Sequence, residues 1–328
     1  NIIDRPQDGR FTIHFKEDNV EVRVSTLPTG YGESVVMRLL RSTATGLRFD
    51  DLGLTPYSYG LLKTQIEKPN GMVITTGPTG SGKTTTLYAI LTTLNTPEIK
   101  IITLEDPIEY KLAGINQSQI DAIKNYTFAS GLRSILRQDP DIIMVGEIRD
   151  LETADTAINA ALTGHLVLST LHTNSAAGAV PRFLAMGVKE FLLAPSLNAI
   201  IGQRLVRRLC PACKKEATLD QETHERITKE LFAISPKSGI TVDRERMTFY
   251  EPVGCDECHG LGFKGRIGIY EIMVMSPDIE QLILAKSSSE YQIQEIAVKN
   301  GMVTMLQDGI LRALEGVTSL KEIFSVAE

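Results

Sequence analysis

One glycine-rich loop constrains this chain more than any other feature of its sequence. Residues 77–84 read Gly-Pro-Thr-Gly-Ser-Gly-Lys-Thr and fill every position of the pattern G-x-x-x-x-G-K-[ST]. The apolar run 72–74 precedes the loop, and a helical pattern over residues 83–94 follows it. Strand, loop and helix in this order are typical of a phosphate-binding loop, because its glycines let successive backbone amides turn toward phosphate oxygens. A glycine-rich turn that fits the pattern by chance is the alternative.

The residue types in the loop predict a site for a nucleotide and Mg²⁺. The N-terminus of the following helix adds a partial positive charge to the loop amides. We expect Lys83 to reach the β- and γ-phosphates and the Thr84 hydroxyl to bind Mg²⁺. The residues expected to contact the nucleotide are Gly77, Pro78, Thr79, Gly80, Ser81, Gly82, Lys83, Thr84 and Thr85.

From residue 58 onward, short apolar runs alternate with helical patterns. The runs that predict strands are 72–74, 101–104, 141–145 and 166–170, and the patterns that predict helices are 83–94, 127–138 and 151–162. This order favours an α/β fold with a parallel sheet covered by helices on both faces. Residues 11–40 instead alternate apolar and polar side chains, which predicts a small β-rich domain.

These patterns, together with breakers such as Gly46, Gly53 and Pro56, predict how the 328 residues are divided. The expected segments are a β-rich domain truncated at its start (1–45), a linker (46–57), the α/β core (58–204), a cysteine-containing element (205–270) and a C-terminal helical domain (271–328).

A carboxylate, Glu147, closely follows the apolar run 141–145. Ligands collect at the carboxyl ends of parallel strands, so a carboxylate there is placed to hold Mg²⁺ or to orient an attacking water. The alternative is a surface ion pair with Arg149 or Arg133.

A second acidic group follows the run 101–104, where Glu105, Asp106 and Glu109 lie within five residues. Crowded like charges raise one another's pKa, which costs stability unless a cation or a base function uses them. A solvated acidic turn at Pro107 is the alternative.

The run 166–170 is followed by His172. A histidine at this place can donate a hydrogen bond to a γ-phosphate or to a nearby carboxylate. A purely structural role is equally compatible with the sequence.

The four cysteines form two C-x-x-C pairs, Cys210 with Cys213 and Cys255 with Cys258. Each pair offers two thiolates to one ion, so two pairs complete a tetrahedral zinc site. A disulfide does not suit the expected compartment, and a redox pair does not suit an irregular segment. Residues 255–259 also spell the haem c attachment pattern, but that chemistry requires export.

Charge and hydropathy argue against several classes of protein. The net charge of −6, from 34 basic and 40 acidic residues, is a poor match to nucleic acid. The basic stretch from Arg204 to Lys215 is interpreted as a solvated or interface face. No apolar run approaches the roughly 20 residues that span a bilayer, and the first residues carry no secretory signal pattern, so the cytoplasm is the expected compartment. The missing initiator Met favours a fragment of a longer protein.

Four motifs thus follow one another at four expected strand ends, residues 77–84, 103–110, 139–149 and 168–174. They resemble the Walker A, Asp box, Walker B and His box of the secretion ATPase superfamily, and specifically its type II secretion and type IV pilus assembly ATPases. The resemblance covers nearly the whole chain. It implies a RecA-like core, preceded by the end of a β-rich, PAS-like second N-terminal domain. As in that family, no Asp precedes Glu147, so the division of labour between Glu105, Glu109 and Glu147 stays open.

The resemblance also implies roles for four arginines. Family members direct arginines from the β-rich domain toward the nucleotide, and Arg23 and Arg38 occupy the matching places. Arg133 and Arg137 match as well, and their i, i+4 spacing puts them on one helix face. A guanidinium can stabilise charge that builds on the γ-phosphate. A solvated or ion-paired surface residue is the alternative for each.

Taken together, the resemblance implies a cytoplasmic, hexameric ATPase with ATP, Mg²⁺ and Zn²⁺ as ligands, the zinc element being typical of assembly and secretion rather than retraction ATPases. Hydrolysis would drive assembly of a type IV pilus or a type II secretion pseudopilus. The implied partners are further copies of the chain and inner-membrane platform and docking proteins, with membrane contact only through them and no direct contact with nucleic acid. A nucleic-acid translocase or conjugation-type ATPase on the same ring, and a non-catalytic nucleotide-gated scaffold, remain as alternatives.

Overall fold

A computed structural model describes residues 3–15, 18–41, 48–243, 247–285 and 289–327. The chain divides into two compact units, which are described separately. The first comprises Asn1–Leu47 with Glu109–Leu112, and the second comprises Arg48–Ile108 with Ala113–Glu328. Within the described residues, no helix has both the length and the apolar character needed to cross a bilayer.

The first unit is an antiparallel sheet of three strands, β1 (Gln7–Phe15), β2 (Asp18–Thr29) and β3 (Gly32–Arg41). The predicted alternation of side chains therefore corresponds to strands. The turn between β2 and β3 is tight, because Thr29 pairs with Gly32. Gly32 has a φ of 122°, a conformation open to glycine but not to larger residues.

The second unit is built around a seven-stranded sheet with the order β12-β9-β4-β8-β7-β5-β6. All neighbours pair in parallel except β12, which is antiparallel to β9. The strands are β4 (Gly71–Thr76), β5 (Ile101–Glu105), β6 (Asn116–Gln119), β7 (Ile142–Val145), β8 (Leu166–Leu171), β9 (Leu197–Leu209) and β12 (Phe263–Val274). The predicted parallel sheet is confirmed.

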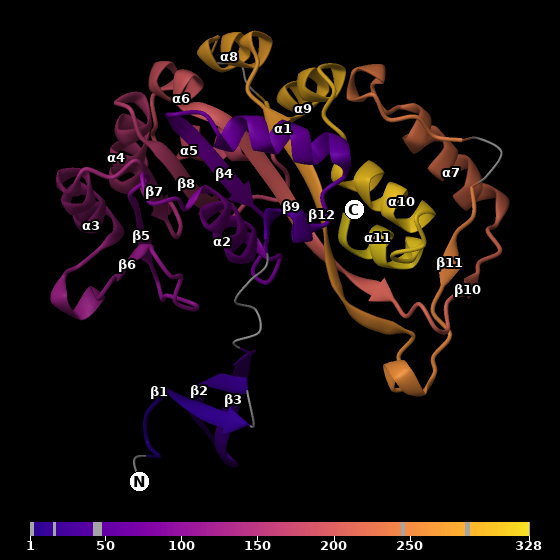
Figure 1. The fold of residues 1–328 in the computed structure, drawn as a ribbon, viewed down its shortest axis with the longest axis horizontal. Helices are drawn as coiled ribbons and strands as arrows, with labels where there is room; N and C mark the ends of the chain where they lie inside the picture. Colours follow the sequence, from indigo (N-terminus) through magenta and orange to yellow (C-terminus); the bar gives the residue numbers. More distant parts are fainter. Residues whose placement is uncertain (1–2, 16–17, 42–47, 244–246, 286–288, 328) are drawn as a thin grey trace. The chain divides into compact units, whose positions relative to one another are not determined.

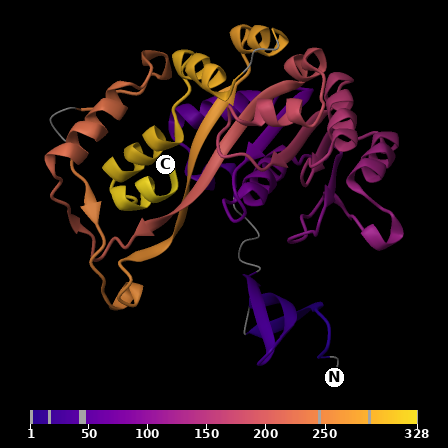
Figure 2. The same cartoon turned by 180° about the vertical axis from the view of Figure 1, so that it is seen from behind.

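Helices cover both faces of this sheet. On one face lie α1 (Pro56–Ile66) and α2 (Lys83–Leu94), and on the other α3 (Phe128–Ile135), α4 (Leu151–Leu162), α5 (Ala179–Ala185) and α6 (Glu190–Ser196). Figure 1 shows α1 crossing in front of the strands, and in Figure 2, seen from behind, β9 and β12 lie in front of it. Side chains from the sheet and from α3, α4 and α6 form the largest buried core, which holds the sheet rigid.

Further α-helices follow in the described residues, with a small two-stranded antiparallel sheet of β10 (Lys215–Glu216) and β11 (Tyr250–Glu251). The helices are α7 (Gln221–Phe232), α8 (Pro277–Leu284), α9 (Glu290–Lys299), α10 (Met305–Leu314) and α11 (Leu320–Ala327). Of these, α10 packs on β12 and α11 on β9. The helical C-terminal part is therefore attached to the long strands at the edge of the sheet.

Several expected segment boundaries differ from the structure. Within the expected linker 46–57, residues Phe49–Leu52 form a 3-10 helix whose Phe49 and Leu52 are buried, and Pro56 begins α1. The boundaries expected after residues 204 and 270 fall inside β9 and β12, which pair with each other. The sequence pattern does not indicate the full length of β9, because the strand becomes partly exposed and basic from Arg204 onward. Its apolar run therefore ends before the strand does.

Buried polar side chains join α10 to the sheet and to the start of the second unit. Asp308 accepts a hydrogen bond from the backbone amide of Tyr270 at 3.0 Å, and the Tyr270 hydroxyl donates to the Leu52 carbonyl at 3.0 Å. Arg312, one turn along α10, donates to the Gly53 carbonyl and pairs with Glu315. Burial raises the pKa of Asp308 to about 6, even though the charge of Arg312 opposes that shift.

This raised pKa predicts a pH dependence of stability. The folded chain keeps the Asp308 proton between pH values of about 4 and 6, where the unfolded chain has lost it, so stability falls as the pH rises through this range. Asp308→Asn removes that loss, and its stability relative to the parent should improve by up to about 3 kcal/mol between pH 4 and pH 7. Urea unfolding at both pH values measures the difference. Glu295→Gln, at an exposed carboxyl, is the control and should show no such trend.

Candidate functional site

The parallel sheet brings the predicted motifs to one edge. The loop 77–82 leaves the end of β4, Glu105 is the last residue of β5, and His172 directly follows β8. Glu147 lies two residues beyond β7, which pairs with both β5 and β8. Because all four strands point the same way, their carboxyl ends form the edge at which ligands bind in open α/β sheets.

The loop itself has the backbone conformation that a phosphate site requires. Gly77, Gly80 and Gly82 have φ values of 150°, 82° and 91°, and Gly82 caps the N-terminus of α2. The ammonium of Lys83 donates to the carbonyls of Gly77 at 2.8 Å and Pro78 at 3.0 Å, so the side chain folds back over the loop. Burial lowers the pKa of Lys83, and the nearby charge of Glu147 acts against this shift.

Polar groups without partners in and near the loop are also consistent with a phosphate ligand. The Ser81 hydroxyl and one oxygen of Glu147 are both buried, and neither has a hydrogen-bond partner in the described part of the chain. Buried polar atoms normally have partners, so orphaned atoms at a binding site are consistent with a ligand that completes them. The Thr84 hydroxyl follows Lys83 on the first turn of α2, where it would hold Mg²⁺ beside the phosphates.

The structure brings Glu147 and His172 together. Oε1 of Glu147 pairs with Arg149 at 2.6 Å, and Oε2 lies 3.4 Å from Nε2 of His172. The Glu147 side chain is 14% exposed, and its Oε2, beside His172, is buried and has no hydrogen-bond partner within the described residues. The ion pair with Arg149 that the sequence offered as an alternative is therefore present, but it engages only one of the two carboxylate oxygens.

Glu105 has a different environment. Its carboxylate is buried and accepts hydrogen bonds from the Tyr88 hydroxyl, from Thr103 Oγ1 at 2.5 Å and from Gln117 Nε2 at 3.1 Å. Protein donors thus occupy both of its oxygens. Sequence reasoning missed Tyr88 and Gln117, because neither belongs to a motif and each comes from a different element of the sheet region.

The four predicted arginines fall into two pairs. Arg23 on β2 lies directly opposite Arg38 on β3, so the two share one face of the small sheet, and Arg23 pairs with Glu109 at 2.9 Å. Arg133 pairs with Glu152 of α4 at 2.5 Å. Arg137 lies beyond the end of α3, in a 3-10 turn, and donates to the Arg133 carbonyl at 2.9 Å. The helix face expected for Arg133 and Arg137 is therefore interrupted at Leu136.

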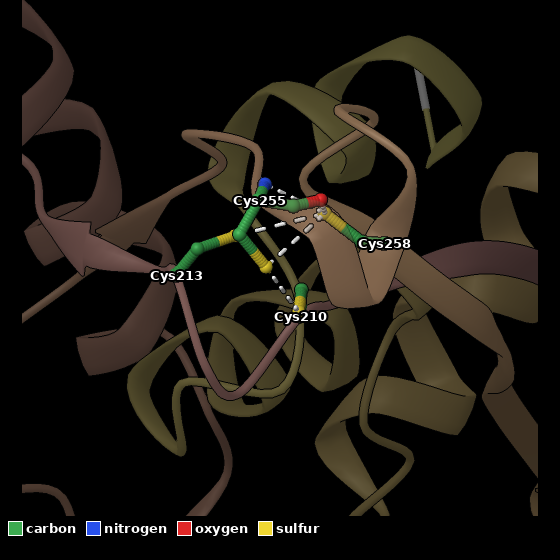
Figure 3. A group of neighbouring side chains, drawn as sticks. All are labelled: Cys210, Cys213, Cys255 and Cys258. Atoms are coloured by element: carbon green, nitrogen blue, oxygen red, sulfur yellow. Dashed lines mark hydrogen bonds between the residues drawn. The ribbon is translucent and has the colours of Figure 1, made fainter.

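The two C-x-x-C pairs converge although residues 214–254 separate them (Figure 3). All four sulfurs lie within 4.8 Å of one another, and the pairs 210–255, 213–258 and 255–258 are each 3.8 Å apart. A zinc tetrahedron with bonds of about 2.3 Å places its sulfurs about 3.8 Å apart. The donor set and its spacing therefore fit a tetrahedral zinc ion.

Backbone amides favour the thiolate form of two of these sulfurs, those of Cys213 and Cys258. Sγ of Cys258 accepts from the amides of Cys255 at 3.2 Å and Gly262 at 3.1 Å, and Sγ of Cys213 from Gly254 at 3.3 Å. Desolvation opposes ionisation, but the Cys255 and Gly262 amides, together with the neighbouring thiols, lower the pKa of the Cys258 thiol to about 6, while burial and the surrounding thiols raise the pKa of Cys255 to about 11. Thiolate is the form that binds metal.

Comparison with known proteins agrees with this geometry. The family model described as type II/IV secretion system protein matches residues 2–325. The chain belongs to this family. It is 48% identical to type II secretion system protein E of Pseudomonas aeruginosa over 321 residues and 46% identical to putative type II secretion system protein E of Escherichia coli K12 over 322 residues. It is also 46% identical over 327 residues to the type IV pilus assembly ATPase PilB of Pseudomonas aeruginosa.

These alignments cover 98–99% of the chain but only part of each relative. The chain spans 61% and 62% of the two type II proteins and 55% of PilB. Among solved structures, the pilus retraction motor PilT with bound ADP has a TM-score of 0.67 at 25% identity, and the match covers 97% of this chain and 77% of PilT. DotB of Legionella pneumophila has a TM-score of 0.69 at 21% identity. The match covers 98% of this chain and 77% of DotB, and it supports the fold.

The cysteine cluster yields a prediction for this family member. Elemental analysis should find about one zinc per chain, and Cys255→Ser should lose most of it, because three thiolates hold zinc less tightly than four. Amide exchange in residues 205–270 should then rise more than in the sheet core. Asp256→Asn, between two of the ligands, is the matched control and should keep the metal. A stable, folded parent protein without zinc would contradict the assignment.

Proposed function

We propose that this chain is the ATP-hydrolysing part of a motor that assembles a type II secretion pseudopilus or a type IV pilus. The observation that carries the proposal is the placement of Lys83, Glu147 and His172 at one sheet edge, in a chain of the type II/IV secretion family. A phosphate-binding loop alone also serves switches and scaffolds. A carboxylate beside it with a free oxygen favours hydrolysis.

The residues at this edge divide the work of hydrolysis. The loop amides and Lys83 hold the β- and γ-phosphates, and Mg²⁺ at Thr84 would neutralise part of their charge. The free oxygen of Glu147 accepts a proton of the attacking water. That water's oxygen bonds to the γ-phosphorus, the bond to the β–γ bridging oxygen breaks, and ADP and phosphate leave. His172, 3.4 Å from the same carboxylate, orients it and donates toward phosphate oxygens.

Of the three carboxylates that the sequence left open, Glu147 is assigned as the base. Glu105 is buried among three donors, which suits a residue that fixes the end of β5. Glu109 is engaged with Arg23. An attacking water needs an acceptor with a free lone pair, and one oxygen of Glu147 has no hydrogen-bond partner in the described part of the chain.

The further proposals concern the whole machine. Six copies form a ring in the cytoplasm, held at the inner membrane by platform and docking proteins rather than by direct insertion. Arg23 and Arg38 act on the γ-phosphate during hydrolysis, and Arg133 and Arg137 support the site from α3 and its extension. The identity to both type II secretion proteins and PilB supports this class of machine, and the acidic net charge disfavours a nucleic-acid track.

Two substitutions test the hydrolytic site. Lys83→Ala should abolish turnover by removing a phosphate contact, and Glu147→Gln should bind ATP but hydrolyse it at least about 100-fold more slowly. Steady-state phosphate release and ATP affinity measure the two effects. The exposed residues Lys68 and Glu222 give matched controls, Lys68→Ala and Glu222→Gln, which should behave like the parent. Parent-like hydrolysis by both site variants would refute the proposed site.

The ring makes a separate prediction. Specific ATPase activity should rise with protein concentration as rings assemble, because neighbouring subunits complete each site. Arg23→Ala and Arg38→Ala should lower kcat much more than ATP affinity, since the contact forms mainly in the transition state. Arg5→Ala is the control, because Arg5 is exposed and lies ahead of β1, away from the pairing of Arg23 with Arg38. A rate independent of concentration would contradict the ring, and normal kcat in both variants would contradict the arginine roles.

A further inference from the structure

The strand β9 lies against the phosphate-binding loop and restricts it from behind. A Cβ atom on Gly77 would come within 2.5 Å of the Gln203 carbonyl oxygen, and one on Gly82 within 2.8 Å of Gln203 Nε2. The Gln203 side chain is buried and accepts a hydrogen bond from Thr86 of α2 at 2.8 Å. The loop therefore needs glycine at both positions because of β9 as well as because of phosphate.

The next residue on β9, Arg204, joins two parts of the site. Its Nη1 donates to the Gln203 carbonyl at 3.0 Å, and Nη1 would lie 3.2 Å from a Cβ on Gly77. Its Nη2 donates to the Asn174 carbonyl at 2.9 Å. Asn174 lies two residues beyond His172, so one guanidinium links the segment that carries this histidine to Gln203, the β9 residue that Gly77 of the loop approaches closely.

Other contacts fix the segment on either side of Asn174. The Thr173 amide donates to Thr76 Oγ1 at 2.9 Å, and the Ala176 amide donates to Glu271 Oε1 at 2.5 Å. These contacts attach the segment to β4 and β12. Arg204 supplies the connection to β9, so it helps to set the separation between His172 and the loop.

The charge of Arg204 is not matched locally. Within the part of the chain that the structure describes, no carboxylate forms an ion pair with its guanidinium. Burial lowers the pKa of Arg204, and the charge of Glu271 acts against this shift. The positive charge of Arg204 also acts on Lys83, where it adds to the lowering of the pKa that burial causes. Keeping an unpaired, half-buried cation here is unfavourable unless its geometry serves the site.

We propose that Arg204 is a positioning residue for hydrolysis, which ties the His172 segment to Gln203, the β9 residue against which the phosphate-binding loop packs, and so sets the spacing between that segment and the loop. The catalytic part of this inference rests on the proposed function. The bridge itself does not depend on it. Planar guanidinium is suited to the task because its fork makes two divergent hydrogen bonds from one rigid group, which an ammonium does not reproduce.

The test compares Arg204→Gln and Arg204→Lys with Arg208→Gln, a control at an exposed arginine of the same strand. Both Arg204 variants should lower kcat by about tenfold or more, while the affinity for Mg·ATP changes by less than about threefold. The control should match the parent in both measurements. Parent-like kcat in Arg204→Lys would mean that charge alone suffices, and an affinity loss as large as the kcat loss would make Arg204 a binding residue; either result overturns the proposal.

Hydrogen exchange without nucleotide separates this inference from the proposed function. Amides in residues 77–84 and 172–178 should exchange faster in Arg204→Gln by about tenfold, and remain parent-like in Arg208→Gln. If the parent hydrolyses no ATP but these amides loosen, the proposed function fails and the bridge stands. Unchanged exchange in both segments overturns the bridge, whatever the activity.

Discussion

The hydrogen-bond register of β4 with its two parallel neighbours is the constraint on which the remaining structure depends. Thr76 at the end of β4 lies opposite Leu171 of β8 and Gly202 of β9. The residues that follow these three positions are the loop, His172 and Gln203, so a single level of the sheet presents all of them. A slip of one residue in either pairing would turn each side chain to the opposite face and separate these groups. The site is therefore a product of strand register before it is a product of any one motif.

The sequence was sufficient where the decisive interactions are local. The strands and helices around residues 71–171 follow from periodicity, and the loop conformation follows from its glycines. Sequence was insufficient where partners are distant along the chain. β9 and β12 were divided between segments because their outer halves carry exposed, charged side chains, and only their mutual pairing reveals them as strands. For the same reason Arg204 was interpreted as part of a basic surface, whereas its contacts lie at Gln203 and Asn174.

The acidic residues illustrate what only the fold can distinguish. In the sequence, Glu105 and Glu147 are equivalent, because each follows an apolar strand. In the structure, donors from α2, β5 and β6 surround Glu105, and burial of a carboxylate is tolerated only with such donors. Glu147 keeps one oxygen without a hydrogen-bond partner within the described residues, beside His172. The chemistry available to a carboxylate is thus set by which hydrogen bonds its neighbours have already used.

The cysteine cluster is connected to the sheet through β9 and β12 and is not a separate appendage. Cys210 directly follows β9, and Cys255 and Cys258 precede β12, with the Cys210 amide donating to the Gly262 carbonyl at 2.9 Å. The two-stranded sheet of β10 and β11 and the helix α7 lie in the interval between the two pairs of cysteines, which accounts for their wide spacing in the sequence. A metal ion at this position would join the outer ends of the two long strands. Because the middle of β9 lies behind the phosphate-binding loop, holding its outer end against β12 also preserves the register that places Gln203 and Arg204. The cysteine cluster at the end of β9 and the phosphate-binding loop at its middle thus share one strand, so a metal ion held by the cysteines would also stabilise the geometry around the loop.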